Sequence, residues 1–285
     1  SSDLAGTWWG WSEVNNSMQT TDFLQGGNPD LGYIKRKEFT VGLDASLWKG
    51  LVRLNANYFV TNTEGLLAQP QNYPSYFQTY YPKSDMRPYI NMNNQRRTGV
   101  DLSVNVGKKH GDFEWNVGLV GMYYTSKNTK WDENVKYDWL KAEGEAIDAL
   151  RGYQCIGFFK DAADVESSAK VNANTKPGDL KYVDQNNDGV INEQDQVVLG
   201  KWGASWVMGL NLTAKYKGFT LFVAGTGSFG GKGLKNNSYM HVYGDRKYSE
   251  VVRGRWTEET ADIATYPRLT TQGGDLNFVA SDFWL

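Results

Sequence analysis

An acidic turn in the second half of the chain has the residue types and spacing of a calcium-binding loop. Side chains with oxygen atoms stand at alternate positions, and Gly189 permits a sharp bend between them. Calcium takes roughly six to eight hard oxygen ligands, and several carboxylates offset its charge. The predicted ligands include one backbone carbonyl, at Val190, and one side chain that acts through water, at Asn192: Asp184, Asn186, Asp188, Val190, Asn192 and Asp195.

Two features of this turn weaken the calcium interpretation. The twelfth position is Asp195 rather than Glu, so a bidentate closing ligand must reach further. No strong helix pattern flanks the turn, which argues against a paired EF-hand sensor. We therefore predict a structural calcium site without a switching role. The alternative is an Asx-rich turn that binds no ion.

A loop rich in Tyr, Pro and Asn follows the first pair of predicted strands and forms the second candidate site. Its aromatic rings could stack on sugar rings or hold a peptide. Packing of the loop on other loops is an equally good explanation. The candidate substrate contacts are Tyr73, Tyr76, Phe77, Tyr80 and Tyr81.

Residues suited to bond-making chemistry are sparse. Cys155 is the single cysteine, and His110 and His241 are the two histidines. Neither a Gly-x-Ser-x-Gly elbow nor a His-Glu-x-x-His motif occurs, and the acids form no recognisable hydrolase pair. The sequence therefore predicts no catalytic residue and no enzyme.

The elements that must position these loops are three strand pairs of one design. In each pair, an alternating apolar and polar strand runs into a short polar turn, and a second alternating strand returns. The turns are Lys49-Gly50, the segment 107–112, and Lys217-Gly218. Because successive strand side chains point to opposite faces, each pair has one apolar face and one polar face. In the first pair the apolar residues are Phe39, Val41, Leu43, Ala45, Leu47, Val52, Leu54, Ala56, Tyr58 and Val60.

Three observations favour a membrane wall over a soluble antiparallel sheet, which alternation alone would also fit. The alternation persists for about 9–11 residues, the length of a tilted membrane crossing. Short turns at one end and long loops at the other are typical of outer-membrane barrels. Aromatic residues, which favour the membrane–water interface, also gather near strand ends: Trp48, Phe113, Tyr123, Tyr216 and Phe219.

Composition excludes some classes of protein. The chain has 285 residues and a net charge of -2, so no basic surface for nucleic acid is indicated. No apolar run approaches the length of about 20 residues that a membrane helix needs. We expect irregular structure over residues 1–30, a helix over roughly 139–150, and a strand at the last three residues. Both ends look like cuts in a longer protein.

Several motifs in one order resemble the SusC/RagA-type TonB-dependent outer-membrane transporters of Bacteroidetes. The central motif joins the stretch from Lys176 to Asp184, the acidic turn, and Val197 to Gly200. The resemblance spans nearly the whole chain. The other matching segments are Gly27–Leu31, Arg97–Asp101, Gly152-Tyr153, Gly157–Phe159, Arg255–Thr257, Tyr266–Leu269 and Ala280–Leu285.

The resemblance implies an all-β fold: an antiparallel transmembrane β-barrel with long extracellular loops. Residues 1–285 would form part of a 22-stranded barrel. The chain would cross the bacterial outer membrane many times. Residues 126–200 would be a long extracellular loop insertion. The plug domain, the TonB box and the final strands of the family lie outside this sequence.

The resemblance also implies a function and partners. Family members import oligosaccharides or peptides with a SusD-like lipoprotein as a lid, and TonB acts on their plug domain. Outer-membrane lipid would surround the wall. Two other classes compete with this interpretation. A secreted calcium-dependent carbohydrate-binding module predicts a closed sandwich, and a surface glycan hydrolase predicts turnover that one Asp or Glu substitution abolishes.

Overall fold

The structure, a computed structural model, describes residues 4–11, 14–23, 26–73, 87–271 and 276–285. The chain divides into two compact units. Unit 1 comprises Ser1–Lys136, Lys141–Ile147 and Trp206–Gly227, and unit 2 comprises Tyr137–Leu140, Asp148–Ser205 and Ser228–Leu285.

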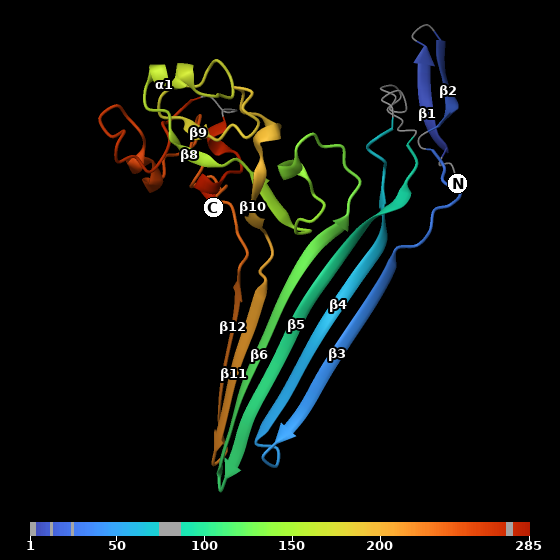
Figure 1. The fold of residues 1–285 in the computed structure, drawn as a ribbon, viewed down its shortest axis with the longest axis vertical. Coiled ribbons are helices and arrows are strands. Elements are labelled where there is room, and N and C mark those ends of the chain that lie inside the picture. The colour runs from blue at the N-terminus through green and yellow to red at the C-terminus, as the bar shows by residue number, and fades with distance from the viewer. Residues whose placement is uncertain (1–3, 12–13, 24–25, 74–86, 272–275) are drawn as a thin grey trace. The chain divides into compact units, whose positions relative to one another are not determined.

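Unit 1 is built on an antiparallel six-stranded sheet in the order β12-β11-β6-β5-β4-β3 (Figure 1). The prediction of an all-β antiparallel fold is therefore confirmed. This sheet is open, with β3 at one edge and β12 at the other. Its strands are β3 (Lys35–Leu47), β4 (Val52–Ala68), β5 (Ile90–His110), β6 (Phe113–Lys130), β11 (Trp206–Tyr216) and β12 (Phe219–Phe229).

The three predicted hairpins are present, and their turns have the backbone that tight turns require. Lys49 and Gly50 have φ angles of 58° and 87°, and Lys217 and Gly218 have 44° and 86°. Glycine adopts such positive angles without steric cost, which explains its place in both turns. The turn between β5 and β6 places Gly111 at a φ of 60°.

The strands are longer than the apolar alternation that predicted them. β4, β5 and β6 contain 17, 21 and 18 residues. Their extra length lies at the end away from the short turns, where polar residues continue the ladder of backbone hydrogen bonds. A register shift around Gly65 interrupts the pairing of β4 with β5 there.

Residues 1–30, expected to be irregular, contain an antiparallel pair: β1 (Leu4–Trp11) and β2 (Val14–Phe23). That expectation was wrong for these strands. Threonine and tryptophan favour extended backbone, so the Gly, Ser and Asn residues among them did not prevent strand formation.

The helix expected over roughly 139–150 is also absent. The segment contains a single 3-10 turn, Asp138–Leu140, and ends in β7 (Ala149–Gly152). Gly144 has a φ of 88°, which an α-helix cannot contain. The Asn128 N–H donates to the Glu145 carbonyl at 2.9 Å, so this backbone pairs with the end of β6 instead.

Unit 2 consists of short elements around an aromatic core. Its strands pair as β8 (Cys155–Phe158) with β9 (Leu180–Tyr182), and as β10 (Val197–Lys201) with β7. Its α-helix is α1 (Ala162–Ser167). Its 3-10 helices beyond Asp138–Leu140 are Glu193–Asp195, Glu250–Gly254, Leu276–Phe278 and Asp282–Trp284.

The last of these 3-10 helices contradicts the expectation that the final three residues lie in a strand. Trp284 is 3% exposed in the core of unit 2. Among the described residues, no helix has the length and apolarity that a membrane crossing needs.

Candidate membrane-spanning wall and loop unit

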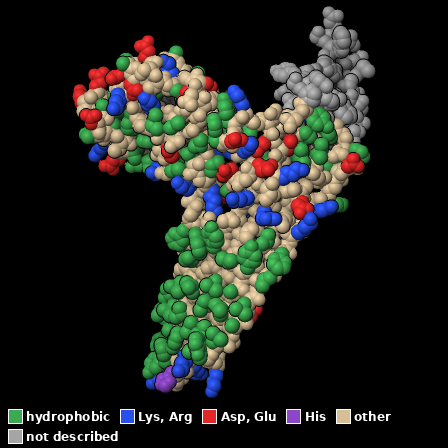
Figure 2. Space-filling view, in the orientation of Figure 1, with side chains coloured by type: hydrophobic (Ala, Val, Ile, Leu, Met, Phe, Trp, Pro, Cys, Tyr) green, Lys and Arg blue, Asp and Glu red, His purple; other side chains and the backbone are tan. Residues whose placement is uncertain are grey.

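The strand register brings the predicted apolar residues together on one face of the sheet in unit 1. We call this face the outward face. Ala45 lies opposite Leu54 and Leu54 opposite Val104, and the row continues through Leu119 and Leu210. Parallel rows lie on either side of it. Figure 2 shows the resulting apolar surface over the half of the sheet nearer the short turns.

Two groups of aromatic side chains, most of them exposed, border this apolar surface. Toward the long loops, Tyr58, Tyr123 and Trp206 lie in one register row, and the Tyr123 and Trp206 rings are 4.5 Å apart. Toward the short turns, Phe113 pairs with Tyr216. Trp48 and Phe219, at the same end, expose 72% and 81% of their surface.

The separation of the two aromatic groups matches the thickness of a bilayer. Tyr123 and Phe113 are ten residues apart on β6, which is about 34 Å along a strand. At a strand tilt of about 45°, this spans roughly 24 Å, close to the apolar band of about 25 Å on outer-membrane barrels. We call the surface between the two groups the apolar belt.

Many large side chains of the apolar belt remain exposed, and the others are half-buried. Leu43, Leu102 and Leu210 expose 57%, 44% and 52% of their surface. The competing carbohydrate-binding module predicts a closed sandwich, in which a second sheet buries such a face. Large contiguous apolar patches on a protein surface mark sites of interaction with another protein or with lipid.

The opposite face of the sheet, which we call the inward face, carries a polar ladder. Asn57 donates to Asp101 at 2.7 Å, and Asn55 donates to Asp44 at 2.6 Å. Gly99 lies on this face, where a Cβ would stand 2.5 Å from the Phe59 ring. Glycine in the Arg97–Asp101 motif thus leaves room for that ring.

The motifs of the second half of the chain converge in unit 2. Tyr153, Tyr182, Tyr266 and Trp284, from four separate segments, lie in one buried cluster. Their rings are in contact: the Tyr153 and Tyr182 centroids are 5.2 Å apart, and those of Tyr266 and Trp284 are 5.7 Å apart. These motifs therefore build the core of the unit.

An ion pair and its hydrogen bonds join two of these segments to the short stretch that contains Asn277. Asp179, 5% exposed, lies 2.6 Å from the Nε of Arg268 and accepts a hydrogen bond from the Asn277 amide at 2.7 Å. The side-chain oxygen of Asn277 in turn accepts from the Leu180 N–H at 2.7 Å. In the sequence, Asp179 and Arg268 were visible only as motif residues. Asn277 gave no signal, because it stands outside every motif.

The acidic turn is ordered by hydrogen bonds to its own backbone. Asp184 accepts from the Gly189 N–H at 2.8 Å, and Asp188 accepts from the Val190 N–H at 2.9 Å. Asp195 is fully buried and accepts from the N–H groups of Gln185 and Asn192.

The turn carries the hard side-chain oxygens that calcium prefers, at Asp184, Asn186, Asp188 and Asp195. These oxygens already accept hydrogen bonds within the turn, so calcium would have to compete with those donors. In the described part of the chain, no group of three or more His, Cys, Asp or Glu side chains is placed to hold a metal. Calcium binding, with Val190 and Asn192 among the ligands, stays a prediction.

The thiol and the imidazole of unit 2 are set in packed, partly desolvated surroundings. Burial raises the pKa of the Cys155 thiol, so it is protonated at neutral pH. Burial also lowers the pKa of His241, and the nearby Arg246 lowers it further. The His241 ring packs 4.6 Å from that of Trp284. Both residues thus act as packing residues.

Comparison with known proteins agrees with this geometry. No family model matches the chain. TonB-dependent receptor P3 of Formosa agariphila is 25% identical over 232 residues, covering 76% of this chain and 22% of that receptor. TonB-dependent receptor P26 of the same organism is 28% identical over 281 residues, covering 91% and 27%.

The chain is similar to the TonB-dependent receptors. Comparison with solved structures shows a similar fold. The structure of the RagAB peptide transporter superposes with a TM-score of 0.67 at 17% identity, over 96% of this chain and 30% of that chain. The RagAB peptide importer in its open-open state gives 0.69 at 18% identity, over 98% and 29%. The resemblance to SusC/RagA-type TonB-dependent transporters is thus confirmed.

The chain spans less than a third of the length of these receptors and transporters. At 17% and 18% identity, the comparison with RagAB shows similarity of fold. The closed barrel is accordingly an inference from the relatives, because the sheet of unit 1 is open. The relatives are named as receptors or transporters, which agrees with the prediction of a protein that is not an enzyme.

The predicted substrate contacts of this receptor-like chain divide into two groups. Tyr73, which exposes 37% of its surface, lies just after β4. Tyr76, Phe77, Tyr80 and Tyr81 lie outside the described residues. Their role in binding a substrate stays a prediction.

Proposed function

We propose that this chain is part of the wall and loops of an outer-membrane transporter that imports a nutrient by TonB-dependent transport. The observation that carries the proposal is the exposed apolar belt between two aromatic groups about one bilayer apart. Similarity to TonB-dependent receptors supplies the class of transporter. Neither argument requires an enzymatic step, and we assign none.

The proposed orientation follows from the ends of the strands. Short turns at Lys49-Gly50 and Lys217-Gly218 would face the periplasm, and the loops at the other end would face the exterior. The polar inward face would line the lumen or contact a plug domain. Residues 126–200 would belong to the extracellular part, although β6 continues to Lys130 before that excursion begins.

The proposed cargo is an oligosaccharide or a peptide, and the proposed partner is a SusD-like lipoprotein that covers the extracellular side. Support comes from similarity to RagAB, which is named as a peptide transporter. Large exposed side chains in unit 2, including Tyr248 at 71% and Ile263 at 77%, provide surface for such a lid.

A growth experiment tests the transport proposal. A strain that lacks the gene for the complete receptor should lose growth on one class of oligosaccharide or peptide supplied as sole nutrient. The complete receptor should restore growth, and loss of TonB should abolish it again. Unchanged growth on every nutrient, or uptake that persists without TonB, would contradict the proposal.

We also propose a structural calcium ion at the acidic turn. Because a ligand that binds only the folded state stabilises that state, calcium should raise the unfolding temperature of the complete receptor. Asp184→Ala combined with Asp188→Ala should remove this increase, since both carboxylates lie in the turn. The measurement is thermal unfolding in detergent with calcium and with a chelator.

A matched control for the calcium experiment is Asp262→Ala, which removes one exposed carboxylate of unit 2 outside the turn. It should leave the calcium-dependent increase unchanged. If the unfolding temperature of the wild-type receptor is the same with calcium and with chelator, the turn is the ion-free alternative.

A further inference from the structure

Beyond the loop-side end of the apolar belt, the outward face carries two further register rows that are rich in cations. The nearer row crosses four strands, and we call it the basic row: Lys37, Asn62, Arg96 and Lys127. The next row outward contains Lys35, Glu64, Asn94 and Lys130. Together the two rows hold five cations and one carboxylate.

Side-chain contacts confirm that members of these rows share one face. Lys37 donates to Glu64 at 2.7 Å, and Arg96 donates from Nε to Asn62 at 2.7 Å. Lys37 and Arg96 are exposed, as is Lys127. Figure 2 shows Lys and Arg side chains along the edge of the apolar surface.

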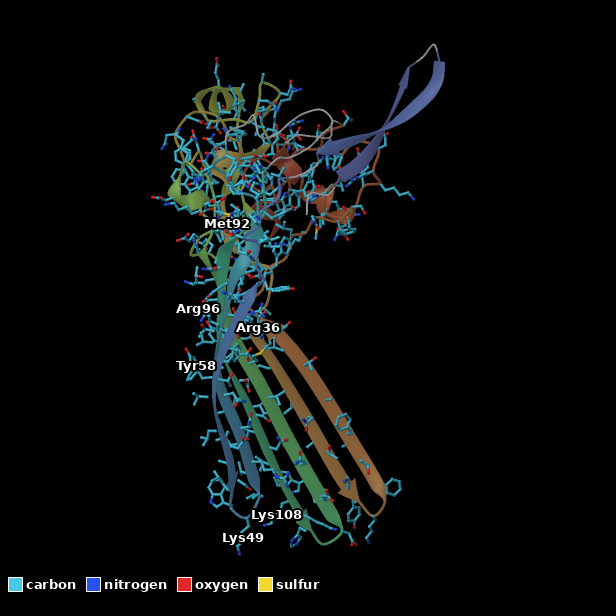
Figure 3. The ribbon with its side chains drawn as sticks, turned by 90° about the vertical axis from the view of Figure 1, so that its right-hand side faces the viewer. Arg36, Lys49, Tyr58, Met92, Arg96 and Lys108 are labelled. Carbon is cyan, nitrogen blue, oxygen red and sulfur yellow. The ribbon has the colours of Figure 1, made fainter. Side chains whose placement is uncertain are left out.

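Arg96, in the middle of the basic row, lies at the depth of lipid headgroups if the apolar belt spans the bilayer. On β5, Arg96 is four residues beyond Val100, which shares a row with Tyr58 and Tyr123. Four residues extend about 14 Å along a strand, or roughly 10 Å along the membrane normal at a tilt of about 45°. In Figure 3, Arg96 lies beyond Tyr58 on the side away from Lys49 and Lys108.

The chemistry of the basic row suits phosphate. A guanidinium carries N–H groups on three nitrogens, and the bond from Arg96 to Asn62 uses Nε, so the terminal nitrogens can donate to an anion. Lys127 adds a positive charge on the neighbouring strand. Glu64 is the one carboxylate in the two rows, and its single negative charge cannot neutralise five cations.

We propose that the basic row binds the phosphate groups of anionic lipid headgroups in the leaflet on the long-loop side. This inference rests on the proposed membrane location of the sheet. A lipid is favoured over an acidic protein because the row continues the face whose adjoining part would be covered by acyl chains. Each cation near an anionic surface strengthens attraction, and several in one row act together.

The test uses the complete transporter in detergent and native mass spectrometry. Diphosphoryl lipid A is the probe, and phosphatidylcholine is the uncharged comparison. The wild type should bind diphosphoryl lipid A more tightly. Combining Lys37→Gln, Arg96→Gln and Lys127→Gln should weaken that binding by about tenfold or more, because three cations are lost. Arg96→Lys alone keeps the charge and should weaken it much less.

A matched control removes three cations at the other end of the belt: Lys49→Gln, Lys108→Gln and Lys217→Gln. It should leave lipid A binding within about twofold of the wild type, since the attraction between a cation and an anionic headgroup falls off over a short distance. Circular dichroism should confirm that both triple variants are folded. If a row variant fails to fold, Arg96→Gln alone is compared with Lys108→Gln.

Three results would overturn the proposal. The first is that the triple variant of the basic row (the row variant) binds diphosphoryl lipid A as tightly as the wild type does. The second is a control variant that loses as much binding as the row variant. The third is complete displacement of the lipid by inorganic phosphate alone, which would assign the row to a soluble anion. These results leave the transport proposal intact, whereas a wild-type transporter that stays soluble without detergent would overturn both.

Discussion

Replacing Leu119 by arginine should prevent stable insertion of the complete transporter, or destabilise it by about 2–4 kcal/mol, as arginine does near the bilayer midplane on a barrel's lipid face. Leu119 lies in the central row of the apolar belt and exposes 48% of its surface. The measurement is urea unfolding of the transporter in lipid vesicles, with outer-membrane levels in cells as a second readout.

Val120→Arg is the matched control for this prediction. Val120 is the next residue on β6, exposes a similar 45%, and lies on the inward face. The same charge there should cost much less, because the inward face of a barrel of this class is polar. Equal losses from the two substitutions would contradict the assignment of faces.

Lipid contact can also be separated from burial under protein. In a Cys155→Ser background, a nitroxide label at position 119 should collide with oxygen, which concentrates in the bilayer. A label at position 120 should collide less with oxygen. If the label at 119 is shielded from oxygen and from water-soluble reagents alike, protein covers the face and the membrane assignment fails.

Asp179→Ala should destabilise unit 2 by up to about 3–5 kcal/mol, because it leaves the partly buried charge of Arg268 unpaired. The substitution removes the partner of Arg268 and an acceptor for the Asn277 amide. Because Asn277 also positions the Leu180 N–H, we expect the start of β9 to loosen as well. Limited proteolysis and hydrogen exchange of the complete transporter would measure both effects.

An exposed ion pair in the same unit provides the control for Asp179. Glu250 and Arg253 are 3.5 Å apart, and their side chains are 75% and 82% exposed. Glu250→Ala should change stability by less than about 0.5 kcal/mol, because solvent screens such pairs. If Asp179→Ala is as mild as Glu250→Ala, the Asp179 network contributes little to the fold.

The wall of the fold was predictable because its signal is local. Alternation from Phe39 to Val60 determines which side chains share a face, and the Lys49-Gly50 turn determines the register of that hairpin. The paired rows across β3 and β4 follow from these two facts. The resemblance to a transporter family was likewise carried by contiguous motifs.

Unit 2 was much less predictable, because its contacts are distant in sequence. Its core joins Tyr153 to Trp284, and its ion pair joins Asp179 to Arg268. Its elements are also too short to leave a periodic pattern. The stretch around Gly144 misled us for a related reason, since its helix-favouring residues are overridden by a pairing with Asn128.

The candidate sites were predictable in residue type more than in arrangement. The spacing of Asp184, Asn186 and Asp188 indicated the turn, but not that both oxygens of Asp195 bind its backbone. The cations of the basic row drew no attention in the sequence, because Lys37, Arg96 and Lys127 become neighbours only through the register of three hydrogen-bonded strand pairs.

The free edges of the sheet, β3 and β12, bear on how such a protein reaches its membrane. Hydrocarbon offers no partner to an unpaired amide or carbonyl, so neither rim tolerates acyl chains until another strand docks against it. Insertion of this wall one hairpin at a time, unaided, is therefore unfavourable. Biogenesis should need a factor that shelters both rims until the cylinder seals, and stalled molecules should be prone to strand-to-strand self-association.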